Sequence, residues 1–175
     1  ALFRLSLVSD LIRQALLMLL PLILYKLLKP VDKTIAALMV IFALLCVPVS
    51  LLNELNHFAV LLLSSGAGYL AAFQANQLNA LVMFFLELRK YGTFIPQLLS
   101  FWVLLLGYLV FKSNFLPKIL GILLIADCFG LLIYVCQSFL LPGYDVISYP
   151  CLAVSFIAEL GLTLWLLIKG VKDQK

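Results

Sequence analysis

The fold is decided by residues 34–63, which read TIAALMVIFALLCVPVSLLNELNHFAVLLL. No charged side chain occurs between residues 34 and 52, and such an apolar run is typical of a helix in lipid. At 1.5 Å per residue a helix over the whole stretch is about 45 Å long, against about 30 Å for the hydrocarbon core of a bilayer. The run therefore predicts a membrane-spanning helix that is longer than the core is thick.

The composition of the whole chain also indicates a membrane protein. Of 175 residues, 65% are apolar and 11% are charged, and the mean hydropathy is +1.18, whereas soluble domains are about 45–50% apolar and about 25% charged. So few charged side chains cannot cover a water-facing surface, which excludes a soluble globular domain. A disordered chain, a collagen and a disulfide scaffold are excluded on the same grounds. The lipid bilayer is the expected partner.

Four further apolar runs bring the number of spans to five, and we predict one all-α bundle over residues 1–175. The predicted spans cover about residues 5–28, 34–63, 78–111, 117–141 and 150–168. Residues 64–68 (SSGAG) break the helix, and two polar patches, residues 53–57 and 87–92, lie nearly equidistant from the turn at residues 66–72. This symmetry predicts a helical hairpin that extends past the non-cytoplasmic interface or folds back along the membrane surface. Two short re-entrant or interfacial segments are the alternative.

The lysines predict the orientation. Eight of the nine lysines flank the first and third turns or follow the last span, at Lys26, Lys29, Lys33, Lys112, Lys118, Lys169, Lys172 and Lys175. Residues 58–86 and 142–149 contain no lysine or arginine. By the positive-inside rule the lysine-rich turns and the C-terminus are cytoplasmic, and five spans then put Ala1 outside. Because the net charge of +4 comes from basic residues scattered at helix ends, we expect no nucleic-acid partner.

Each predicted span carries polar residues at offsets of three, four and seven, which place them on one helix face. Charged groups facing lipid at the bilayer centre cost at least about 2.5–3.5 kcal/mol each, so these faces should converge inside the bundle. The stripes are Ser6, Asp10, Arg13 and Gln14; Ser50, Asn53, Glu54 and His57; Lys90, Thr93, Gln97 and Ser100; Asp127, Gly130, Tyr134 and Gln137; and Ser155, Glu159 and Thr163. The candidate intramembrane polar site comprises Asp10, Arg13, Glu54, His57, Glu87, Asp127 and Glu159.

Within this set two pairs invite interpretation. Asp127 and Glu159 each lie about ten residues from the cytoplasmic end, on two helices joined by a short hairpin. They form either a proton- or cation-binding site or a neutral carboxyl that is hydrogen-bonded between helices. Asp10 and Arg13 are expected to form an ion pair within their own helix.

The sequence does not indicate an enzyme, and it identifies no cofactor. A metal site is not expected, because His57 is the single histidine and the four cysteines lie in apolar runs without a CxxC spacing. The favoured function is therefore a non-enzymatic structural or accessory subunit of a larger membrane complex. The alternative is a protein that binds and transports a small molecule, proton or ion through a polar intramembrane cavity. An intramembrane enzyme that uses Glu54, His57 and Glu87 is the least favoured class.

A set of short motifs resembles a known family. In order and spacing they are residues 2–5 (LFRL), 24–31 (LYKLLKPV), 65–70 (SGAGYL), 107–113 (GYLVFKS), 116–121 (LPKILG) and 159–167 (ELGLTLWLL). Together they resemble the bacterial membrane family that carries domain of unknown function 4386, and the resemblance extends over essentially the whole chain. It implies a six-span protein of the bacterial inner membrane whose first helix is absent here, and it implies no catalytic residues. Arg89-Lys90 departs from the family pattern, in which a His-Asp-like pair is more usual.

Overall fold

The architecture is a bundle of α-helices, without a β-strand among the residues that the computed structural model describes (2–141, 146 and 148–169). The elements are α1 (Leu2–Leu28), α2 (Lys33–Leu63), the 3-10 helix η1 (Gly68–Ala72), α3 (Ala75–Gly92), α4 (Phe94–Leu98), α5 (Phe101–Lys112), α6 (Lys118–Leu140) and α7 (Ser148–Lys169). Among these described residues, five stretches are long and apolar enough to cross a membrane, and α3 to α5 form one of them. The predicted all-α fold with five transmembrane helices is confirmed.

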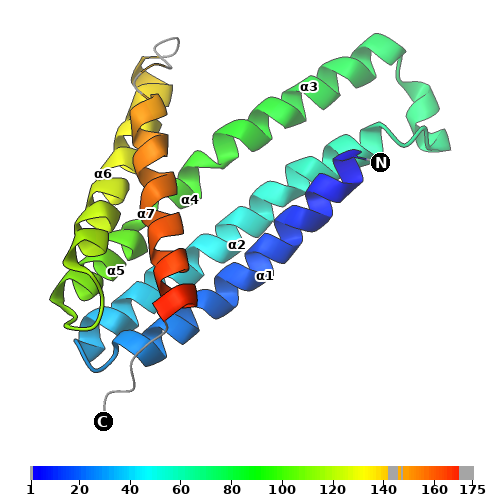
Figure 1. The fold of residues 1–175 in the computed structure, drawn as a ribbon. Helices are drawn as coiled ribbons and strands as arrows, with labels where there is room; N and C mark the ends of the chain where they lie inside the picture. The colour runs from blue at the N-terminus through cyan, green and yellow to red at the C-terminus, as the bar shows by residue number, and fades with distance from the viewer. Residues whose placement is uncertain (1, 142–145, 147, 170–175) are drawn as a thin grey trace.

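The first two helices run antiparallel along each other (Figure 1). The carboxylate of Asp32 caps α2 by accepting a hydrogen bond from the backbone N–H of Ile35 at 3.1 Å. This bond, with a smaller contribution from Lys112, holds the pKa of the Asp32 carboxyl below its ordinary value. The Lys112 ammonium lies 3.4 Å from the same carboxylate and so ties the end of α5 to the α1–α2 turn.

The predicted hairpin consists of α2, η1 and α3, and it projects away from the α6–α7 pair (Figure 1). Pro48 does not interrupt α2, which continues to Leu63 and ends where Gly66 adopts a positive φ of 70°. The third span then bends twice, at Thr93 and at residues 99–100, on its way from α3 to α5. The structure thus has one long hairpin instead of two short re-entrant segments.

Glycines set the contact between α5 and α6. A Cβ atom on Gly121 would lie 2.6 Å from the backbone nitrogen of Phe111 and 2.8 Å from the carbonyl oxygen of Gly107. Since real Cβ atoms do not approach other atoms so closely, only glycine at position 121 allows this spacing of the two helices. α6 begins directly after Pro117, where its missing N–H needs no partner, and α7 packs back along α6.

The interior is divided into an apolar half and a polar half. The apolar core lies between the helices at the end of the bundle that carries the α1–α2 and α5–α6 turns, around Leu28, Met39, Leu109 and Leu124. Large apolar side chains are also exposed along the outer faces of the helices, as expected of a surface that contacts lipid. Apart from Ser113 at the end of α5, the buried polar residues lie farther from these two turns, in the part of the bundle that holds the candidate site.

Candidate functional site

A cavity of about 360 Å³ lies between the helices in the polar half of the bundle. Its polar lining consists of Arg13, Gln14, Ser50, Asn53, Glu54, Thr93, Gln97, Ser100 and Glu159. All nine belong to the predicted stripes, and they come from α1, α2, the third span and α7. The lining thus includes residues from four of the five predicted stripes. α6 contributes only Leu131 to the lining.

Gln14 is the most deeply buried polar residue of this lining. Its side chain is 2% exposed, and neither its amide oxygen nor its amide nitrogen has a hydrogen-bond partner among the described residues. The side-chain oxygen of Gln97 is likewise without one. An unpaired buried polar group costs about 1–3 kcal/mol, so such groups normally meet water or a ligand. Both donors and acceptors are thus available to a bound molecule.

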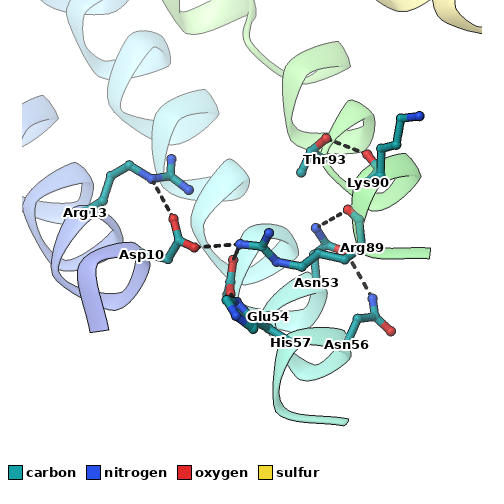
Figure 2. Close-up of polar contacts among 9 residues, drawn as sticks. All are labelled: Asp10, Arg13, Asn53, Glu54, Asn56, His57, Arg89, Lys90 and Thr93. Atoms are coloured by element: carbon teal, nitrogen blue, oxygen red, sulfur yellow. Dashed lines mark hydrogen bonds and ion pairs between the residues drawn. The ribbon is translucent and has the colours of Figure 1, made fainter. Parts of the chain in front are cut away.

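Beside the cavity, Arg89 of α3 joins two carboxylates from different helices. Its Nη2 donates to the Asp10 carboxylate of α1 at 2.6 Å and lies 3.6 Å from Oε1 of Glu54 on α2 (Figure 2). The other oxygen of Glu54 lies 3.3 Å from Nδ1 of His57, one turn further along α2. Glu54 and His57 are buried, whereas Asp10 and Arg89 are partly exposed. Asp10, Glu54, His57 and Arg89 form what we call the hairpin cluster.

Asn53 positions Arg89 from the backbone side. Its side-chain amide donates to the carbonyl oxygen of Arg89 at 3.0 Å, and its own oxygen accepts a hydrogen bond from Asn56 (Figure 2). A Cβ atom at Gly92 would collide with the Asn53 side chain, so glycine at position 92 lets α3 approach α2 this closely. The polar patches of α2 and α3 therefore do lie level with each other, as the hairpin prediction requires.

The expected Asp10–Arg13 ion pair is present, whereas the placements of Lys90 and Glu87 need correction. The Asp10–Arg13 pair exists at 3.7 Å, but the shorter contact of Asp10 is with Arg89, a residue outside the predicted site. Lys90, which was assigned to the inward stripe, is exposed, and its ammonium lies 4.0 Å from the exposed Glu87. Glu87 therefore does not join the hairpin cluster. Thr93 follows Arg89 by four residues and Lys90 by three, so periodicity alone could not decide which base points inward.

The two residues of the other predicted pair, Asp127 and Glu159, lie in different surroundings. Asp127 of α6 is fully buried, and one of its oxygens accepts a hydrogen bond from the hydroxyl of Ser155 on α7. Its other oxygen has no partner in the described part of the chain. Glu159, one turn after Ser155, is exposed and lines the cavity. The hydrogen bond from Ser155 to Asp127 thus links α6 to α7. The carboxylate of Glu159 is accessible to a solute in the cavity.

Three side chains of the hairpin cluster could hold a metal ion. One ligand atom each from Asp10, Glu54 and His57 lies within 4.8 Å of the other two. One imidazole and two carboxylates make a ligand set that suits zinc and related divalent ions. Because Asp10 precedes Glu54 by more than forty residues, no local spacing in the sequence reveals this set.

The fold and the site define a polytopic helical membrane protein with a polar cavity between its helices. A family model described as domain of unknown function (DUF4386) matches residues 1–170, and the chain belongs to that family. Neither the curated proteins nor the solved structures contain a match to this chain.

Proposed function

We propose that the protein binds a small polar molecule or ion in the intramembrane cavity and takes part in its transport. The observation that carries this proposal is Gln14, a fully buried amide in the cavity wall whose donor and acceptor both lack a partner among the described residues. The hydrocarbon around the bundle offers an unsatisfied amide no hydrogen-bond partner, so a polar solute that binds in the cavity and bonds to Gln14 is stabilised. The cavity volume of about 360 Å³ lies within the range of about 300–1,000 Å³ typical of small-molecule sites.

Charged groups favour a solute with polar or ionic ends. Arg13 and Glu159 both line the cavity. The ion pair of Arg13 with Asp10 is long, at 3.7 Å, so the guanidinium can also interact with a solute. Charged residues within membrane spans commonly mark the path of a substrate or ion. We therefore expect neutral amides, zwitterions and small ions to bind better than apolar solutes of the same size.

A thermal-stability assay of the purified chain in nanodiscs tests the proposal. The probes are acetamide, urea, glycine, serine and inorganic phosphate, each compared with an apolar solute of similar size. At least one polar probe should raise the melting temperature of the native chain and leave that of Gln14→Leu unchanged. Gln137→Leu is the matched control, because Gln137 is also buried but is bonded to Ser148 outside the cavity. A probe that stabilises Gln14→Leu as strongly as the native chain binds elsewhere and contradicts the proposal.

A second candidate function, an accessory subunit of a larger membrane complex, is supported by the exposure of Glu159. This carboxylate lies in the middle of α7, a helix whose main contacts are with α6. A charge facing lipid at mid-depth costs at least about 2.5–3.5 kcal/mol, and a helix of a partner subunit would remove that cost. Native gel electrophoresis from the source membrane tests this, since a subunit co-migrates with a larger assembly and a monomer does not.

The proposed location is the inner membrane of a bacterium, with the C-terminus in the cytoplasm. The α1–α2 turn and the α5–α6 turn lie at the same end of the bundle, which is also where α7 ends (Figure 1). Lys26, Lys29, Lys112, Lys118 and Lys169 therefore gather at one membrane face, as the positive-inside rule expects of the cytoplasmic side. A reporter enzyme that is active only outside the cytoplasm, fused after residue 175, should stay inactive.

A further inference from the structure

We propose that Asp10, Glu54 and His57 form a binding site for one divalent transition-metal ion of the zinc class, and that this ion competes with Arg89 for the two carboxylates. An ion centred among three atoms at most 4.8 Å apart lies within about 2.8 Å of each, and Zn–N and Zn–O bonds are roughly 2.0–2.2 Å long. Shifts of less than about 1 Å in three side chains therefore suffice to coordinate the ion.

The helices place the ligands for this purpose. Glu54 and His57 are three residues apart on one face of α2, and this Glu-x-x-His spacing recurs in the metal sites of helical bundles. Asp10 lies on α1, and its carboxylate is held near that of Glu54 because both contact the guanidinium of Arg89. The site therefore needs no rearrangement of the backbone.

The cavity gives the ion an entry path and a place for a further ligand. Glu54 lines the cavity as well as belonging to the hairpin cluster. Gln14, one turn after Asp10 on α1, also lines it and has two buried amide atoms without a partner in the described chain. Three protein ligands leave a coordination position open for water, which Gln14 can hold.

Arg89 makes the site switchable. Its guanidinium now donates to Asp10 at 2.6 Å and lies 3.6 Å from Glu54, so it uses the oxygen atoms that a metal would need. The Arg89 side chain is 28% exposed, and it can therefore turn away from the cluster without crossing a packed core. A divalent ion supplies more charge to the same two carboxylates than Arg89 does, so binding of the ion displaces the guanidinium.

Zinc binding to the tag-free full chain in nanodiscs tests the proposal. The probe is Zn²⁺ alone, its stoichiometry is measured by elemental analysis and its affinity by competition with a chelator. The native chain should bind one ion. His57→Gln should weaken binding at least about tenfold, because changing even a hydrogen-bond partner of a metal ligand has that effect. Arg89→Gln should strengthen binding at least about tenfold, since it removes the competing cation.

The gain in Arg89→Gln keeps the test decisive, because a variant that fails to fold cannot bind zinc more tightly. Glu87→Gln is the matched control, since Glu87 is exposed, pairs with Lys90 and lies outside the hairpin cluster. Its zinc affinity should equal that of the native chain. Zinc that binds His57→Gln and the native chain equally is held elsewhere, for instance by the four thiols, and overturns the proposal. An unchanged affinity in Arg89→Gln overturns the competition.

Discussion

Replacing Arg89 with methionine should destabilise the fold, because it leaves two carboxylates without their shared cation. Exposed ion pairs contribute about 0–1 kcal/mol, whereas breaking a buried pair costs about 3–5 kcal/mol. Glu54 is buried, but Arg89 and Asp10 are 28% and 22% exposed, so solvent screens part of the interaction. We therefore expect Arg89→Met to lower the free energy of unfolding by about 2 kcal/mol, between those two limits.

Reversible unfolding in mixed SDS micelles, followed by far-ultraviolet circular dichroism, measures this change. Lys90→Met is the matched control, because Lys90 is the next residue on α3 and is exposed; its effect should stay within about 0.5 kcal/mol. In a Glu54→Gln background the cost of Arg89→Met should fall, since one of the two stranded charges is gone. Equal costs for Arg89→Met and Lys90→Met would refute the role assigned to the hairpin cluster.

Three further predictions concern packing, capping and the α6–α7 contact. Gly121→Ala should destabilise the fold by about 1–3 kcal/mol through overpacking, while Gly68→Ala, which points into open space, should change it by less than about 0.5 kcal/mol; SDS unfolding measures both. The pKa of the Asp32 carboxyl is lowered in the folded chain, so the stabilisation it provides is present above its ordinary pKa of 3.8 and is lost as the pH falls through the lower folded pKa. Asp32→Ala should therefore destabilise the fold more at pH 6 than at acidic pH. Equal destabilisation at both pH values would contradict the cap. Ser155→Ala should cost about 0.6–1.7 kcal/mol by removing the donor to Asp127, whereas Ser138→Ala, which loses only a bond to the carbonyl of Tyr134 on its own helix, should have a smaller effect.

Much of the fold follows from the sequence because lipid leaves the backbone few choices. The apolar runs dictate helices, and the Ser/Gly turn at 64–68 separates α2 from η1 and α3, as the left-handed backbone of Gly66 shows. The sequence did not show which prolines would interrupt a helix. Pro48 lies inside an unbroken α2, whereas Pro96 lies in the short α4 of a span that bends on both sides of it.

The candidate site was predictable in composition but not in pairing. The stripe pattern identified the polar wall of the cavity, because lipid excludes those side chains from the outer faces. It could not identify Arg89, because the helix phase of the third span changes at the bends near Thr93 and residues 99–100. Nor could it show that Asp10 meets Glu54 and His57, since that contact depends on how α1 packs against α2.

The reactivity of Cys46 tests the central claim, a polar cavity that small solutes can enter. Cys46 and Cys128 are both buried, but only Cys46 lines the cavity. Single-cysteine chains in nanodiscs, each with the other three cysteines replaced by alanine, are treated with 2-aminoethyl methanethiosulfonate and analysed by mass spectrometry. The account predicts rapid modification of Cys46, slowed in the Ser50→Trp background that fills the cavity, and little modification of Cys128. Equal protection of Cys46 and Cys128 would contradict it.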